Sequence, residues 1–235
     1  MKKSKTKPEG GGKAPLFSFR YLIHDFVRVT AALPGLLWFR PRILYAGKKQ
    51  KQRGGVLIIS NHIGLYDPVY LMFAVWYRRH RFICMQELYE KSFTAFLFRA
   101  FLTIPIDRKN LSMDSFRVIT DSLQAGSAVT MFPGGHVDTD GSSLDSFKSG
   151  MVLMALRSGV PILPVLITRR RHWYNRMTAV IGEPVDIRAS CGEHPTFAQV
   201  NEMTKLLVER EKNLVSYLPG NGNYSAEGAM HGGKQ

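Results

Sequence analysis

His62 and Asp67 are the residues of this sequence whose types and spacing best suit chemistry. They follow the apolar run 56–59, which predicts a buried strand that ends where the histidine begins. An imidazole takes up a proton near neutral pH, and a carboxylate can fix its tautomer and stabilise the imidazolium that forms. The pair could therefore act as a general base. No serine or cysteine nucleophile motif accompanies it, so the attacking group could belong to the substrate.

The same two residues also have a purely structural interpretation. Asp67 and Pro68 stand before the apolar run 69–76, a pattern typical of a helix N-cap with proline at the first helical position. His62 would then be an ordinary loop residue at the end of a strand. This short segment does not decide between the two interpretations, so the rest of the chain must.

Basic residues are concentrated at the amino end of the chain. The 235 residues carry a formal net charge of +14. Residues 1–53 contain 13 Lys and Arg against two acids, whereas the rest contains 19 against 16. Basic segments bind phosphates, either of nucleic acid or of anionic lipid. Cys84 and Cys191 are too few for a disulfide framework or a metal site, which fits a reducing compartment.

The amino-terminal residues favour a membrane surface over nucleic acid. Residues 1–14, rich in Lys and Gly, are expected to form a disordered basic tail. Residues 15–46 place aromatic side chains beside arginines, as in a helical segment that lies in a membrane interface. The longest uncharged run, 29–39, has 11 residues, fewer than the ~20 that a spanning helix needs. An amphipathic helix packed on its own domain is the alternative, and no nucleic-acid fold signature appears.

Residues 47–218 alternate between strand-like and helix-like stretches. The predicted strands are 56–60, 81–85, 102–106, 128–132, 162–168 and 178–181. The predicted helices are 68–78, 92–101, 112–124, 148–157 and 196–217. This alternation predicts an α/β domain with a mixed, largely parallel sheet flanked by helices. The loops at the strand ends of such sheets line a shared crevice. Residues 219–235 are expected to form a flexible tail.

Two further segments could meet the His62/Asp67 pair in that crevice. Arg108 and Lys109 follow a predicted strand end and could hold a phosphate by charge-assisted hydrogen bonds, although a solvated turn explains them equally well. Gly134, Gly135 and His136 end another predicted strand. Their backbone N–H groups could bind an anion or a developing oxyanion, and a plain type II turn is the alternative.

The order and spacing of these blocks resemble the glycerolipid acyltransferase family, typified by 1-acyl-glycerol-3-phosphate (lysophosphatidic acid) acyltransferases. The resemblance covers about residues 54–183. The family's Asn-His-x4-Asp block is matched by Asn61, His62 and Asp67. Its second block ends in an arginine that contacts the acceptor phosphate, matched by Arg108. Its Val-Pro-Ile-x-Pro-Val strand is matched by residues 160–165.

The third block departs from the family pattern Phe-Pro-Glu-Gly-Thr-Arg. Phe132, Pro133 and Gly135 match, as does the downstream Phe-Lys-x-Gly that contains Lys148. The glutamate, the threonine and the arginine are replaced by Gly134, His136 and Val137. Since a carboxylate and a cation are missing from this block, the acceptor's head group stays open.

The resemblance implies transfer of a fatty acyl group from a thioester to the hydroxyl of 1-acyl-glycerol-3-phosphate or a related lyso-lipid, in phospholipid biosynthesis. His62 would be the base and Asp67 its partner. The substrate-binding residues would be Arg108, Lys109, Gly134, Gly135, His136 and Lys148. Neither a covalent intermediate, a metal nor a cofactor is expected, because acyl-CoA or acyl-carrier protein is the co-substrate.

The same resemblance implies a setting for the reaction. The expected partners are the membrane lipid acceptor, the thioester donor and an anionic membrane surface, with no nucleic acid. The protein is expected to be peripheral or monotopic at the cytoplasmic face of a membrane. The alternative is a catalytically inactive membrane-binding protein that retains the acyltransferase fold.

Overall fold

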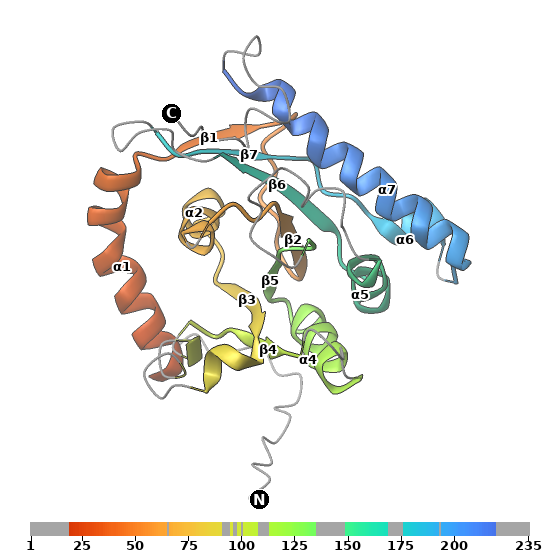
Figure 1. Cartoon of the computed structure of the whole chain (residues 1–235), viewed down its shortest axis with the longest axis horizontal. Helices are drawn as coiled ribbons and strands as arrows, with labels where there is room; N and C mark the ends of the chain where they lie inside the picture. The colour runs from red at the N-terminus through yellow and green to blue at the C-terminus, as the bar shows by residue number, and fades with distance from the viewer. Residues whose placement is uncertain are drawn as a thin grey trace, which may run out of the picture.

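The computed structural model describes residues 19–64, 66–90, 95, 98–99, 101–107, 113–134, 149–168, 176–192 and 194–219. Their strands form a seven-stranded sheet in the order β1-β7-β6-β2-β5-β3-β4. Helices lie on both faces of this sheet, α1 and α2 on one and α4 to α7 on the other (Figure 1). The predicted α/β architecture is therefore confirmed.

The strands are short and mostly buried. They are β1 (Arg42–Tyr45), β2 (Val56–Ser60), β3 (His80–Met85), β4 (Ile104–Ile106), β5 (Ala128–Met131), β6 (Ile162–Thr168) and β7 (Thr178–Ile181). Neighbouring strands are parallel except for the antiparallel pair β6 and β7, so the sheet is mixed but largely parallel, as predicted. β1 was not predicted: it lies in the range 15–46 assigned to a helical segment, yet it pairs with β7.

The helices follow the predictions in place but not in their ends, except for the short helix 187–191, which was not predicted. They are α1 (Phe19–Phe39), α2 (Asp67–Ala74), α4 (Met113–Gln124), α5 (Gly150–Ser158), α6 (Ile187–Cys191) and α7 (Phe197–Asn213), with 3-10 turns η1 (Gln86–Tyr89) and η3 (Leu214–Tyr217). α7 begins with a capping box between Thr196 and Gln199. The predicted helix 92–101 lies largely outside the described residues.

The central strand β2 divides the hydrophobic core into two layers. All five of its residues are buried. Leu57 and Ile59 pack with residues of α4, α5 and α7, whereas Val56 and Ile58 pack with residues of α2. Side chains alternate across a strand, so a fully apolar run buried on both faces is what this position requires. This strand leads directly into the His62 loop.

Arg78 stabilises the opposite edge of the sheet, where the parallel strands begin (the amino edge). Its guanidinium donates to the carbonyl oxygens of Gln52 at 2.6 Å and Gly126 at 2.8 Å, and also to that of Gly54. Burial lowers the pKa of Arg78. These carbonyls precede β2 and β5, so one side chain links the segments that lead into two adjacent central strands.

α1 is attached to the domain at both of its ends. Asp25 accepts two hydrogen bonds from the guanidinium of Arg79, at 3.0 Å and 2.6 Å. At the other end, the ring of Phe39 packs edge-on to Tyr70, with centroids 5.0 Å apart. Gly35 lies so close to Phe73 that an added Cβ would be 2.5 Å from the ring. Among the described residues, no helix combines the length and the apolarity needed to cross a membrane.

Candidate active site

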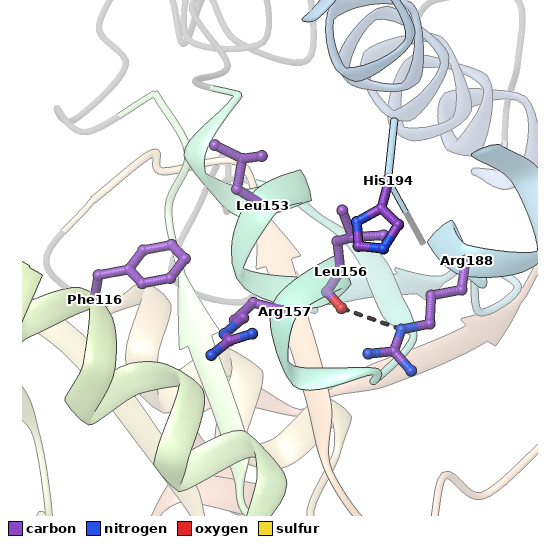
Figure 2. A pocket seen from close by; sticks show the side chains of 6 residues that line it. All are labelled: Phe116, Leu153, Leu156, Arg157, Arg188 and His194. Atoms are coloured by element: carbon purple, nitrogen blue, oxygen red, sulfur yellow. Dashed lines mark hydrogen bonds between the residues drawn. The ribbon is translucent and has the colours of Figure 1, made fainter. Parts of the chain in front are cut away.

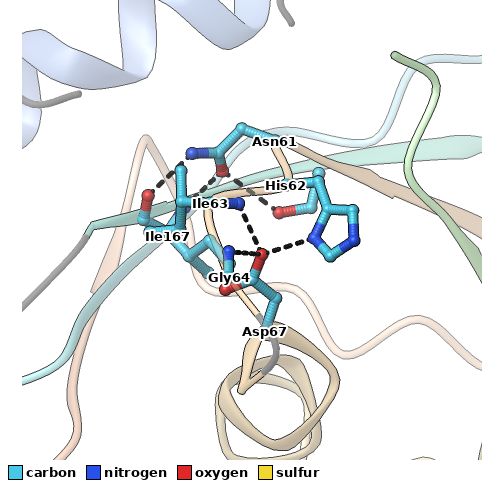
Figure 3. Close-up of polar contacts among 7 residues, drawn as sticks. Asn61, His62, Ile63, Gly64, Asp67 and Ile167 are labelled. Carbon is cyan, nitrogen blue, oxygen red and sulfur yellow. Dashed lines mark hydrogen bonds and ion pairs between the residues drawn. The ribbon is translucent and has the colours of Figure 1, made fainter. Parts of the chain in front are cut away.

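The loop between β2 and α2 brings His62 and Asp67 together at the carboxyl end of a central strand. His62 Nδ1 lies 2.7 Å from Asp67 Oδ2 (Figure 3). The Asp67 side chain is buried, at 1% exposure, whereas His62 keeps 21%. Because a carboxylate only accepts, the neutral imidazole in this pair carries its proton on Nδ1 and its lone pair on Nε2. No described residue hydrogen-bonds to Nε2.

The carboxylate of Asp67 also organises the loop around it. The same Oδ2 atom accepts the backbone N–H of Ile63 at 2.5 Å and that of Gly64 at 2.9 Å. The N-cap interpretation of Asp67 is wrong: the N-cap position is held by Tyr66, with no side-chain hydrogen bond, and α2 begins at Asp67. Asp67 therefore faces back toward His62 and fixes the position of that residue.

Phe132, the first residue after β5, covers one face of the His62 ring. The two ring centroids are 4.2 Å apart and the planes differ by 17°. β5 is the direct neighbour of β2 in the sheet, which is why residues 70 positions apart meet here. The third sequence block thus reaches the same edge as the His62/Asp67 pair, as the α/β prediction required.

Asn61 ties the start of the loop to β6. Its side-chain Nδ2 donates to the Ile167 carbonyl and its Oδ1 accepts the Ile167 N–H, both at 2.9 Å (Figure 3). Ser60 is the last residue of β2 to pair with β6, opposite Val165. The side-chain amide of Asn61 therefore continues the hydrogen bonding between β2 and β6 beyond the last residue of β2. His62 is the next residue in the chain.

The structure describes one residue of the predicted substrate-binding set, and the roles of all six stay predictions. Gly134 is described and buried, two residues after Phe132. The other predicted residues lie outside the described part of the chain: Arg108, Lys109, Gly135, His136 and Lys148. The contacts of Phe132 and Asn61 were not predicted, since both were noted only as motif positions. These contacts depend on the order of the strands in the sheet, which cannot be read from the sequence.

The second block ends on the far edge of the sheet. β4 is an edge strand, separated from β2 by β5 and β3. With strands about 4.8 Å apart, the end of β4 is about 14 Å from the end of β2. Asp107, the residue after β4, is the last described residue before Arg108. Any contribution of this block to the site must bridge that distance with long side chains or the loop that follows.

A depression of about 470 Å³ lies among the helices and does not include the His62 loop (Figure 2). Arg157, Arg188 and His194 line it together with apolar side chains, and Arg188 Nε donates to the Leu156 carbonyl at 3.2 Å. None of these residues belongs to the His62 loop or to its contacts. We therefore do not include this depression in the candidate active site.

Comparison with known proteins agrees with the arrangement at the strand ends. A family model described as Acyltransferase matches residues 42–168, more than half of the chain. The chain belongs to the acyltransferase family. The matched range runs from β1 to the end of β6 and includes the His62/Asp67 pair and Phe132. The resemblance inferred from the four sequence blocks is thus confirmed.

Two individual relatives of this acyltransferase chain are informative. A 1-acyl-sn-glycerol-3-phosphate acyltransferase of Streptococcus pneumoniae (strain ATCC BAA-255 / R6) is 27% identical over 151 residues, which are 60% of this chain and 53% of the relative. The chain thus spans about half the length of that relative. The crystal structure of the 1-acyl-sn-glycerophosphate (LPA) acyltransferase PlsC from Thermotoga maritima is similar in fold, with a TM-score of 0.59 at 20% identity, covering 84% of this chain and 79% of that one.

Proposed function

We propose that this chain transfers a fatty acyl group from a thioester to the hydroxyl of 1-acyl-glycerol-3-phosphate or a related lyso-lipid. The observation that supports it most is the 2.7 Å contact between His62 Nδ1 and Asp67 Oδ2, with His62 Nε2 left without a described partner. The family match and the activities for which the two relatives are named support the same reaction. Acyl-CoA or acyl-carrier protein would supply the thioester.

In this proposal His62 Nε2 takes the proton from the acceptor hydroxyl as its oxygen attacks the thioester carbonyl carbon. Asp67 holds the ring and stabilises the imidazolium. The tetrahedral intermediate then collapses, the carbon–sulfur bond breaks, and the imidazolium returns its proton to the leaving thiolate. The products are the acylated lipid and a free thiol. General-base assistance of this kind typically contributes about 10²–10⁴-fold to the rate.

Further groups are assigned to binding in the same proposal. The backbone N–H groups at Gly134 and Gly135 would stabilise the developing oxyanion, because glycines allow the backbone to approach a ligand closely. Arg108, Lys109, His136 and Lys148 would hold the acceptor's head group. Their side chains carry or can carry positive charge, which suits a phosphate.

Membrane association belongs to the proposal because the acceptor is a lipid. One face of α1 exposes large apolar side chains at helical spacing: Leu22, Phe26, Val29, Leu33 and Leu37. Trp38 at its carboxyl end is also exposed. α1 lies at the side of the molecule with its outer face uncovered by any described element (Figure 1). Such a helix is suited to lie in the interface, at the depth of the head groups.

The decisive experiment is an acyl-transfer assay with defined donors and acceptors. Labelled acyl-CoA and acyl-carrier protein are each offered with lysophosphatidic acid and with other lyso-lipids, using the wild-type chain and His62→Ala. We expect a labelled diacyl product from the wild type and a loss of at least 100-fold in the variant. Circular dichroism and vesicle binding should be unchanged by the substitution.

Two outcomes would contradict the proposal. Undiminished turnover by the His62→Ala variant would remove the histidine from the mechanism. A folded wild-type chain that binds vesicles but acylates none of the acceptors from either donor would instead support the alternative of an inactive membrane-binding protein.

A further inference from the structure

Tyr66 is a large aromatic residue that lies next to the His62/Asp67 pair and is nevertheless 60% exposed. It holds the N-cap position of α2, immediately before Asp67, and makes no capping hydrogen bond there. That position usually holds Ser, Thr, Asp or Asn, whose side-chain oxygens bind the first N–H groups of a helix. Because Tyr66 neither caps the helix nor fills the core, its presence at this position needs another explanation.

The ring of Phe39 connects Tyr66 to the carboxyl end of α1. The ring centroids of Phe39 and Tyr66 are 6.0 Å apart. The same Phe39 ring contacts two side chains of α2, Tyr70 at 5.0 Å and Phe73 at 6.2 Å. The carbonyl of Phe39 also accepts the backbone N–H of Met177 at 3.0 Å. The end of α1 is therefore held against the start of α2, and Tyr66 lies where the two helices meet.

The exposed apolar face of α1 leads up to this junction. Its last members are Leu33, Leu37 and Trp38, and each of them is more exposed than Tyr66. Phe39 follows Trp38 directly and contacts the ring of Tyr66. Tyr66 therefore continues the exposed apolar face of α1 onto the loop that carries His62.

Exposed cations follow the same end of α1. Arg40 and Arg42 both have exposed side chains. Arg40 has a φ of 45°, in the left-handed region that favours glycine, so an arginine stands where the backbone favours another residue. Tyrosine and tryptophan concentrate at membrane–water interfaces, and arginines beside them attract anionic head groups. The residue types around Tyr66 thus match the head-group region of an anionic membrane.

We propose that Tyr66 is a membrane contact of the His62 loop: its ring lies in the same lipid leaflet as the outer face of α1 and holds the loop at the depth of the head groups. The inference rests on the function proposed above, in which the acceptor hydroxyl belongs to a lipid. α1 alone would leave the molecule free to rotate about the helix axis. A second contact beside His62 fixes that rotation, so Tyr66 acts as a positioning residue and does not touch the reacting atoms.

An acceptor in two physical states separates membrane positioning from other roles of Tyr66. Tyr66→Ser removes the ring and supplies a residue that is common at helix N-caps. With long-chain lysophosphatidic acid in anionic vesicles, we expect this variant to lower kcat/KM about tenfold, because withdrawing a large apolar side chain from a membrane changes an equilibrium by that order. With a water-soluble, short-chain lysophosphatidic acid and no vesicles, the variant should match the wild type.

Conservative and distant substitutions complete this comparison. Tyr66→Phe and Tyr66→Trp keep an aromatic ring and should retain wild-type turnover of the vesicle-bound acceptor. Phe197→Ser is the matched control, because Phe197 is also an exposed aromatic residue but lies on α7, at the other face of the sheet. It should leave the turnover of both acceptors unchanged.

Tryptophan fluorescence gives a readout that does not depend on activity. The emission that Tyr66→Trp adds to that of the wild type should be quenched by anionic vesicles whose phospholipids carry bromine on their acyl chains. The emission that Phe197→Trp adds should not be quenched. If the wild-type chain transfers no acyl group, the proposed function fails, and this quenching still decides whether position 66 contacts the membrane.

Four results would each overturn the inference. Wild-type turnover of the vesicle-bound acceptor by Tyr66→Ser would show that the ring positions nothing, and unquenched emission from Tyr66→Trp would show that it does not reach the leaflet. An equal loss with the vesicle-bound and the soluble acceptor would mean that Tyr66 acts on the loop itself. A wild-type dimer that Tyr66→Ser dissociates, measured by sedimentation equilibrium, would mean that a second copy of the chain covers the ring. Should Tyr66→Ser fail to fold, Tyr66→Asn supplies another residue common at N-caps for the same comparison.

Discussion

The imidazole of His62 lies face to face with the phenyl ring of Phe132, with centroids 4.2 Å apart and planes within 17°. A hydrogen bond to Asp67 holds the edge of the imidazole, and the stacked phenyl ring covers one of its faces. The two contacts together fix the orientation of the ring. An aromatic face also attracts a cation. Phe132 is therefore placed to stabilise the imidazolium that the proposed reaction forms.

Replacing Phe132 by leucine should lower kcat about 2- to 10-fold, because an aromatic contact of this kind contributes about 0.5–1.5 kcal/mol. Steady-state kinetics with the acceptor and donor that the acyl-transfer assay selects provides the measurement. Phe132→Tyr, which keeps the aromatic face, should retain most of the activity. Equal kcat in the leucine and tyrosine variants would show that the aromatic face contributes nothing.

Asp67→Asn should impair both catalysis and stability. The variant keeps an oxygen for the Ile63 and Gly64 N–H groups but loses the charge that fixes the His62 tautomer. We expect kcat to fall by about 10²–10⁴-fold and the free energy of unfolding by about 2 kcal/mol. The matched control is Asp121→Asn, whose ion pair with Arg117 is exposed and spans 3.7 Å. A variant at position 67 as active as this control would exclude the proposed pair.

The double substitution Phe26→Ser and Leu33→Ser should weaken binding to vesicles of anionic phospholipid at least tenfold. The two side chains are 66% and 67% exposed on the outer face of α1, and burying one such side chain contributes about 1.5–3 kcal/mol. Co-sedimentation measures the change. The control replaces Met113 and Phe197 by serine, since they are 81% and 78% exposed on other helices. Equal losses in both double variants would contradict a specific role of α1.

Glu211→Gln should change how stability depends on pH. Burial on α7 raises the pKa of Glu211 from an ordinary value of 4.5 to about 8 in the folded chain. Between these values the unfolded chain has released the proton and the folded chain still binds it, so wild-type stability falls as pH rises, by at most about 1.4 kcal/mol per pH unit. The Glu211→Gln variant does not lose stability in this way, because glutamine does not titrate. Tm measured from pH 5 to 8 should therefore diverge, with the variant increasingly the more stable; parallel curves would contradict the assignment.

Much of the fold could be predicted from the sequence because its signals are local. The run Val56–Ser60 is apolar throughout, as a strand covered on both faces must be. The four residues of β1 give no comparable signal: they follow a long helix, begin with Arg42, and become a strand only by pairing with β7. The spacing of His62 and Asp67 also suggested their pairing.

The remaining features of the site depend on contacts between distant segments. The Phe132 ring meets His62 because β5 is adjacent to β2, and Asn61 meets Ile167 because β6 is adjacent on the other side. Strand order is a property of the packed sheet, which a local pattern does not contain. The substrate-binding roles of Arg108, Lys109, Gly135, His136 and Lys148 stay predictions, because these residues lie outside the described part of the chain.

The two edges of the sheet are held by separate side chains. At the carboxyl edge, the loop is assembled around Asp67, which accepts the N–H groups of Ile63 and Gly64 and binds His62. At the amino edge, Arg78 binds the carbonyl oxygens of Gln52, Gly54 and Gly126. A substitution of Asp67 should therefore loosen the end of the sheet that carries His62 and leave the hydrogen bonds of the other end in place, so that activity is lost before the sheet unfolds.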